Sequence, residues 1–352
     1  MIIAGGCYLE HCDEPYWHEL YGSGVRAAAC IGALTKDVKL ITYACKDDLS
    51  SLAATASTFG FEVESTHINH RTSFHYTHGL CTPLITPHPL QIERPASLLV
   101  NTGDILLRFG FIEGDAIVHS DSVVYDPQSA YAPRPFWENG STAKRLAIVA
   151  NRAEAKALTG CDNEDEMLKS LLTGKNVEVV IIKLGPSGAL VATQSDRVTI
   201  PAYETDFVWP IGSGDVFSTF FTYYWAEKAI APANAADKAS KAAAYYCNSG
   251  ALPIPVEFET TFNFPPVGRR TLLSDKTIYL AGPFFTMAQR WLIRESLVHL
   301  RTPGISVFSP FHEVGIGTAQ EVYTPDIVGL EKSSVVFACL DGLDSGTLFE
   351  IG

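Results

Sequence analysis

The sequence predicts an α/β protein of two domains, the first built on a parallel sheet with helices on both faces. Apolar runs such as "VEVVIIKLG" alternate along the chain with segments of helical pattern. Continuously apolar strands separated by helices are typical of parallel sheets buried on both faces. The chain has 352 residues, more than a typical single domain, and the alternation starts again after a proline-containing segment at 252–276.

The elements of the first domain follow from local composition. The opening residues "MIIAGGCYLEHCDE" are predicted to form a buried first strand. Further strands are expected where β-branched residues concentrate, at 38–44, 116–120, 145–151, 177–185 and 189–193. Helices are expected where alanine-rich or periodically apolar segments occur, at 24–34, 152–160, 215–230 and 234–250.

Residues 65–95 interrupt the alternation, because they are rich in His, Thr and Pro. We expect them to form a small projecting sheet or lid. A metal site is the alternative reading of their histidines, but no two of these lie four residues apart on a confident helix. We therefore interpret them as polar lid side chains: His67, His70, His75, His78 and His88.

The second domain is expected to be smaller. The segment 252–276 carries four prolines and lacks helical periodicity, so it marks the boundary. A strand and turn at 277–285, a helix to about Leu300, and strands at 305–310 and 334–342 then form a second α/β unit. We place the domains at 1–268 and 277–352, joined by a linker at 269–276.

Composition excludes some classes of function. The formal net charge is −13 and the acidity is spread through the chain, which argues against nucleic-acid binding. No uncharged apolar run reaches the roughly 18 residues that span a membrane. The start lacks the basic and apolar regions of a signal peptide, and the eight cysteines are scattered without metal-site spacing. These features predict a cytoplasmic protein with reduced thiols.

The stretch "VWPIGSGDVF" at 208–217 is the first candidate site. A Gly-Ser-Gly turn entering a helix presents backbone N–H groups at the positive end of the helix dipole, where they bind anions. Asp215 follows at once, placed to accept a proton from a hydroxyl that attacks a phosphorus held by Gly212, Ser213 and Gly214. The alternative is an ordinary glycine turn in which Asp215 only complements the helix dipole.

Three further motifs favour phosphoryl transfer. "NRAE" at 151–154 places Asn151 and Glu154 at a strand–helix junction, where their oxygens can hold Mg²⁺ through water. "KLGPSG" at 183–188 is a glycine hairpin after an apolar strand, and "YGSGVRAAA" at 21–29 is a glycine turn that opens a helix.

The motifs and their order along the chain resemble those of the PfkB, or ribokinase-like, family of sugar and nucleoside kinases. The resemblance covers residues 1–265. The resemblance implies a three-layer α/β/α domain with a small lid, and ATP and Mg²⁺ as cofactors. "GSGD" is similar to the family's anion hole and catalytic base, and "NRAE" to its magnesium motif. The other implied contacts are Lys183, Gly185 and Gly188 for ATP, and Gly22, Gly24 and Arg26 for the substrate.

The sequence departs from that family's pattern at the acceptor end, where the molecule that receives the phosphoryl group would bind. Trp209, Pro210 and Ile211 stand where the family usually has D-T-T before the anion hole, and Arg26 lies near the position of an asparagine. The resemblance implies a sugar-binding aspartate near the end of the first strand, where Glu10 and Asp13 are the candidates. A polar or anionic acceptor held by Arg26 is one interpretation, and a solvated helix arginine is the other.

The chain ends in "DGLDSGTLFEIG", the second candidate site. Asp344 and Glu350 flank a glycine turn that leads into a helix, and Asp326 precedes the adjacent strand. Paired carboxylates suit cleavage at an anomeric carbon, one attacking or stabilising the centre while the other assists proton transfer. The alternative is that Asp326 and Asp344 are solvated loop acids and that Glu350 is an ordinary helix glutamate.

Residues 277–352 resemble the nucleoside 2-deoxyribosyltransferase family, through "IYLAGPFF" and the segment around Glu350. The resemblance implies a Rossmann-like domain with Glu350 as nucleophile, Asp344 and Asp326 as supporting acids and Tyr279 on the substrate side. The family's domain continues beyond the two residues that follow Glu350, so we expect this one to be incomplete. By analogy we also expect a homo-oligomer.

Together, the two resemblances point to nucleosides, nucleotides or their sugars. The leading hypothesis is an ATP- and Mg²⁺-dependent kinase acting on a hydroxyl of a sugar or nucleoside. The alternatives are an N-glycosidase or deoxyribosyltransferase using Glu350, and a catalytically silent nucleotide-sensing module. Small molecules are the expected partners, with neither nucleic acid nor membrane.

Overall fold

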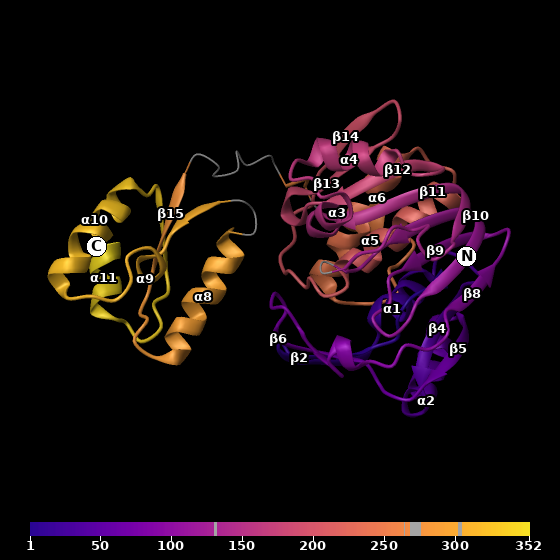
Figure 1. The fold of residues 1–352 in the computed structure, drawn as a ribbon, viewed down its shortest axis with the longest axis horizontal. Helices are drawn as coiled ribbons and strands as arrows, with labels where there is room; N and C mark the ends of the chain where they lie inside the picture. The colour runs from indigo at the N-terminus through magenta and orange to yellow at the C-terminus, as the bar shows by residue number, and fades with distance from the viewer. Residues whose placement is uncertain (130–131, 264, 268–275, 302–304) are drawn as a thin grey trace. The chain divides into compact units, whose positions relative to one another are not determined.

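The computed structural model describes residues 1–129, 132–263, 265–267, 276–301 and 305–352. The chain divides into two compact units, Met1–Val267 and Gly268–Gly352, which are taken separately below (Figure 1). All but the last residue of the predicted linker at 269–276 lies outside the described residues. Among the described helices, none has the length and apolar character needed to cross a bilayer.

A ten-stranded sheet forms the centre of the first unit. Its order is β14-β13-β12-β11-β10-β9-β1-β4-β5, with β8 also paired to β10. The pairs are parallel except β12–β13 and β13–β14. The strands are β1 (Ile2–Ala4), β4 (Lys39–Cys45), β5 (Glu62–Ile68), β8 (Leu98–Asn101), β9 (Ile105–Phe109), β10 (Ala116–Asp126), β11 (Thr142–Asn151), β12 (Val177–Lys183), β13 (Ala189–Ala192) and β14 (Arg197–Ile200).

Helices cover both faces of this sheet, so the predicted three-layer α/β/α class is confirmed (Figure 1). Alternate residues of β11 point to opposite faces: Ala147 and Val149 enter one apolar core, and Ile148 and Ala150 enter the other. The first core holds α1 (Gly22–Ile31), α2 (Leu49–Phe59), α5 (Ser213–Thr222), α6 (Pro232–Ser249) and α7 (Phe258–Thr261). The second holds α3 (Arg152–Thr159) and α4 (Glu164–Leu172).

A separate four-stranded sheet, which we call the lid sheet, has the order β3-β2-β6-β7. Its strands are β2 (Leu9–Glu14), β3 (Trp17–Leu20), β6 (Ser73–His78) and β7 (Leu84–Thr86). The prediction of a single opening strand is wrong, because β1 and β2 belong to different sheets. The chain leaves the central sheet at residues 5–6, where α1 packs so closely that a Cβ on Gly24 would lie 2.5 Å from the Gly5 carbonyl oxygen.

The segment predicted as a lid, 65–95, is therefore only half of the lid sheet. It supplies β6 and β7, while the end of β5 within it pairs with β4 in the central sheet. The predicted helix at 215–230 also divides, because α5 ends at Thr222 and one π-helical turn, Tyr223–Glu227, follows.

The second unit has a parallel three-stranded sheet of order β16-β15-β17. Its elements are β15 (Thr277–Ala281), α8 (Met287–Arg301), β16 (Ser306–Phe308), α9 (Pro310–Glu313), α10 (Ala319–Lys332), β17 (Val335–Ala338) and α11 (Ser345–Ile351). Sequence reasoning missed α10, which contains Pro325, although a capping box of Thr318 and Glu321 marks its start.

Candidate active sites

The start of α5 forms an anion cradle. Gly212 precedes the helix with φ +84, a left-handed conformation that favours glycine, and a Cβ there would lie 2.1 Å from Nε of Arg26. Ser213 donates its N–H and its hydroxyl to the Pro210 carbonyl, at 3.1 and 2.9 Å. The next N–H groups, up to Asp215, have no acceptor within the helix, since they belong to its first turn. They can bind an anion.

A lysine stands beside this cradle. Lys183 ends β12, and its Nζ lies 3.4 Å from the point that a Cβ on Gly214 would occupy. Nζ donates to Oδ2 of Asp126 at 2.6 Å, and the Ser218 hydroxyl donates to the same oxygen at 2.6 Å. Burial lowers the pKa of Lys183, but Asp126 and Glu154 raise it, and the net shift is upward. The cradle therefore has a cation at its edge.

Asp126 is a candidate functional residue that the sequence analysis missed. It ends β10, whereas the predicted strand stopped at 120. Its side chain is 1% exposed, and its Oδ1 has no hydrogen-bond partner within the described part of the chain. An aspartate after the apolar run "SVVY" was the available signal, because ligands bind at the carboxyl ends of strands in open α/β sheets.

Asn151 and Glu154 form the capping box of α3. The Asn151 side chain accepts from the N–H of Glu154 at 2.9 Å, and Glu154 accepts from the N–H of Asn151 at 2.8 Å. Burial, and then the charge of Asp126, raises the pKa of Glu154 to about 7. Two neighbouring buried carboxylates with an unpartnered oxygen on Asp126 suit Mg²⁺, which prefers oxygen ligands. Asp126 and Glu154 are thus a donor set that suits Mg²⁺, and metal binding by Asn151, whose side-chain oxygen caps α3, stays a prediction.

The candidate base, Asp215, is held in a buried ion-pair network. Arg26, 1% exposed, donates to Asp215 Oδ2 at 2.8 Å, to Glu10 Oε2, and from Nε to the Tyr246 hydroxyl at 3.1 Å. The Gln128 amide donates to the other Asp215 oxygen. Burial raises the pKa of Asp215, and Arg26 opposes that shift. Arg26 is therefore not a solvated helix residue, and it already forms ion pairs with two carboxylates.

The two glycines predicted to contact substrate lie at the start of α1. Gly22 has φ +66, and its N–H donates to Glu10 Oε1 at 3.1 Å. The N–H of Gly24 donates to the Gly6 carbonyl at 3.0 Å. Close backbone packing accounts for both glycines, and their contact with substrate stays a prediction.

Gly185 and Gly188 build the turn that follows Lys183. Their φ angles are +56 and +82, and a Cβ on Gly188 would lie 2.0 Å from the Ile200 carbonyl oxygen. The glycines thus allow β13 to turn back beside β12. Their contact with ATP also stays a prediction.

The second unit gathers the four residues predicted there. The Tyr279 hydroxyl, from β15, donates to Glu350 Oε1, from α11, at 2.7 Å. Burial raises the pKa of Glu350, the Tyr279 hydrogen bond opposes it, and the charges of Asp326 and Asp344 raise it further. Asp344 caps α11 by accepting from the N–H of Thr347 at 2.9 Å. Oδ1 of Asp326 is buried and lacks a hydrogen-bond partner among residues the structure describes.

Comparison with solved structures establishes the fold of the first unit as ribokinase-like. A complex of aminoimidazole riboside kinase from Salmonella enterica with aminoimidazole riboside and an ATP analog is 15% identical, with a TM-score of 0.55 over 74% of this chain and 99% of that one. Ribokinase from Thermotoga maritima is 17% identical, with a TM-score of 0.51 over 73% and 97%. Fructokinase from Vibrio cholerae, bound to fructose, ADP and calcium, is 13% identical, with a TM-score of 0.51 over 73% and 95%.

Sequence comparison adds the families. Residues 132–255 match the pfkB family carbohydrate kinase, and residues 278–352 match nucleoside 2-deoxyribosyltransferase. An "uncharacterized sugar kinase" from Archaeoglobus fulgidus is 31% identical over 104 residues, which are 29% of this chain and 41% of that protein. The chain thus spans about two fifths of that relative. The predicted joining of these two families in one chain is confirmed.

Proposed function

We propose that this chain is an ATP- and Mg²⁺-dependent phosphotransferase that phosphorylates a hydroxyl of a sugar or nucleoside. The observation that carries the proposal is the placement of the Lys183 ammonium beside the first turn of α5, which also carries Asp215. Phosphoryl transfer requires N–H groups that bind phosphate, a cation and a carboxylate base, and all three kinds of group lie at the first turn of α5.

Each part has a definite task. Asp215 removes the proton of the acceptor hydroxyl, whose oxygen forms the new bond to the γ-phosphorus while the bond to the bridging oxygen of ADP breaks. The N–H groups at the start of α5 and the Lys183 ammonium bind the oxygens of the transferred group. Asp126 and Glu154 would hold Mg²⁺, which neutralises phosphate charge when bound. The acceptor hydroxyl takes the place of the Gln128 amide at Asp215.

The charges at the acceptor end favour a neutral acceptor. Arg26 is already paired with Glu10 and Asp215, so the three groups carry a net negative charge. An anionic acceptor would be repelled there, whereas hydroxyls can donate to the two carboxylates. Aminoimidazole riboside and fructose, named with two of the similar structures, are compounds of this kind.

A product screen tests the proposal. The protein is incubated with sugars, nucleosides and deoxynucleosides, with and without MgATP, and the products are separated by chromatography. We expect a phosphorylated product that requires MgATP, is absent with Asp215→Asn, and persists with Asp121→Asn, a control that removes an exposed acid. An unchanged rate in Asp215→Asn contradicts the proposal, and nucleotide binding without any product favours the sensing alternative.

A second candidate, N-glycosidase or deoxyribosyl transfer, is supported by the hydrogen bond between Tyr279 and Glu350 near two further acids. Glu350 would attack the anomeric carbon, and Asp326, whose carboxyl pKa is raised by burial, would protonate the departing base. The same screen separates the two activities, since release of free base needs no ATP. Base release that persists in Glu350→Ala refutes this candidate.

A further inference from the structure

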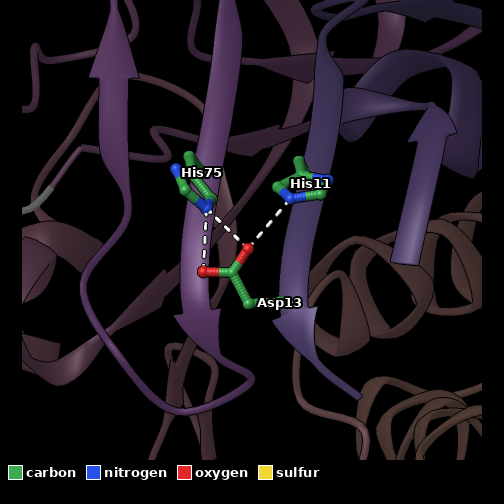
Figure 2. Close-up of side chains that lie close together, drawn as sticks. All are labelled: His11, Asp13 and His75. Carbon is green, nitrogen blue, oxygen red and sulfur yellow. Dashed lines mark hydrogen bonds and ion pairs between the residues drawn. The ribbon is translucent and has the colours of Figure 1, made fainter. Parts of the chain in front are cut away.

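Three side chains of the lid sheet converge outside both candidate active sites. Figure 2 shows His11 and Asp13, from β2, facing His75, from β6. Nε2 of His11 lies 2.9 Å from Asp13 Oδ1, and Nε2 of His75 lies 2.9 and 3.0 Å from the two Asp13 oxygens. The side chains are 31%, 48% and 45% exposed, in the order His11, Asp13, His75, so solvent reaches the group.

Strand register explains why these residues meet. His11 pairs with His75 on one neighbouring strand and with His18 on the other, so three imidazoles form a row across β6, β2 and β3. Asp13 shares their face because it lies two residues from His11, and successive side chains in a strand alternate. Glu10, which bonds to Arg26, is on the opposite, buried face.

We propose that His11, Asp13 and His75 form a binding site for a divalent transition metal, with Zn²⁺ as the favoured ion. Two imidazole nitrogens and one carboxylate are a set that zinc prefers, whereas Mg²⁺ and Ca²⁺ prefer oxygen alone. Metal–ligand bonds of about 2.0–2.1 Å in a tetrahedron separate the ligand atoms by roughly 3.3 Å. The 2.9–3.0 Å between each imidazole and Asp13 needs only a small outward adjustment, and all three ligand atoms lie within 4.8 Å of one another. Solvent supplies the fourth ligand.

His18 is placed to orient one of the ligands. Its Nδ1 lies 3.3 Å from Nδ1 of His11. When Nε2 of His11 binds metal, its Nδ1 carries the proton and donates to His18. Such a partner fixes the tautomer and ring orientation of a metal-bound histidine.

The ion would join two strands that are distant in sequence, since Asp13 and His75 are 62 residues apart. This explains why the spacing of the histidines within 65–95 did not reveal a site: only His75 takes part, and its partners lie in a segment predicted as one buried strand. The site needs neither ATP nor the Asp215 network, so its existence is independent of the proposed kinase activity.

The test is metal titration of the full chain after chelator treatment. Zn²⁺ affinity is measured by competition with a chromogenic chelator, and Co²⁺ serves as a spectroscopic probe. We expect one Zn²⁺ whose affinity falls more than about 100-fold in His75→Ala or Asp13→Ala, since these remove ligands, and about 10–100-fold in His18→Ala. His70→Ala, an exposed histidine of the same region, is the matched control and keeps full affinity.

Two readouts guard against misfolding and unrelated sites. Circular dichroism of each metal-free variant checks the fold, and Zn²⁺ should raise the melting temperature of the wild type but not of His75→Ala. Co²⁺ bound here gives no thiolate charge-transfer band. Unchanged Zn²⁺ affinity in the folded His75→Ala and Asp13→Ala variants overturns the proposal, as does a thiolate band, which would assign the metal to cysteines.

Discussion

Replacing Arg26 with methionine tests the buried charge network directly. The guanidinium side chain is 1% exposed, and those of its partners Glu10 and Asp215 are 5% and 10% exposed. Methionine keeps most of the apolar stem but leaves two buried carboxylates without their cation. Removing one partner of a buried ion pair costs about 3–5 kcal/mol, because the remaining charge is uncompensated. For a unit the size of Met1–Val267, about 2 °C per kcal/mol gives a fall in melting temperature of roughly 6–10 °C.

Calorimetry of the full chain measures this shift, and two further variants calibrate it. Asp215→Asn removes one of the two negative charges and leaves Arg26 paired with Glu10, so we expect a change below about 1 kcal/mol. Lys144→Met breaks an exposed pair with Asp121, whose side chains are 75% and 50% exposed, and should shift the transition by less than about 2 °C. A melting temperature of Arg26→Met within 2 °C of the wild type would refute the reasoning.

Three other predictions concern single side chains. The folded pKa of Glu154, about 7, lies above its ordinary value of 4.5, so the contribution of Glu154 to stability is full below pH 4.5 and falls by roughly 3 kcal/mol up to pH 7; Glu154→Gln should make the pH dependence of urea unfolding shallower by that amount, measured at several pH values without added metal. Lys183→Met should reduce kcat/KM for MgATP by about 10–150-fold through loss of a charge-assisted phosphate contact, and an unchanged value would exclude Lys183 from the donor site. Tyr279→Phe should raise the pKa of Glu350, because it removes the hydrogen bond that lowers it, and the acidic limb of a base-release profile should move to higher pH.

The parts of the candidate phosphate-donor end could be found from the sequence because each is local in sequence. Residues 212–215 form one turn and the start of one helix, and Asn151 and Glu154 form one capping box, so short-range rules apply. Asp126 is the exception. It was missed because the strand that carries it continues past a polar stretch, "HSDS" at 119–122, at which the predicted strand ended.

The acceptor end could not be predicted, because its contacts are long-range. Arg26 meets Asp215 across 189 residues of sequence, and neither residue's neighbours indicate the other. The lid sheet could not be predicted for the same reason. Its strand β2 follows β1 closely in sequence but pairs with β6, more than 60 residues later. The local apolar pattern indicates that a strand forms, but it does not indicate that the chain passes from one sheet to another at residues 5–6, where Gly5 packs against Gly24.

The same network constrains how an acceptor can reach Asp215. Glu10 belongs to the lid strand β2, Arg26 to α1 and Asp215 to α5, so one guanidinium connects three elements. Moving β2 away from α1 would break the buried ion pair between Glu10 and Arg26 and leave Arg26 paired with Asp215 alone. By contrast, Gln128 leaves Asp215 at the cost of one hydrogen bond to a charged group, about 1.5–3 kcal/mol, which an acceptor hydroxyl restores. In the proposed kinase mechanism we therefore expect the acceptor to reach Asp215 by displacing Gln128, because this breaks one hydrogen bond rather than a buried ion pair.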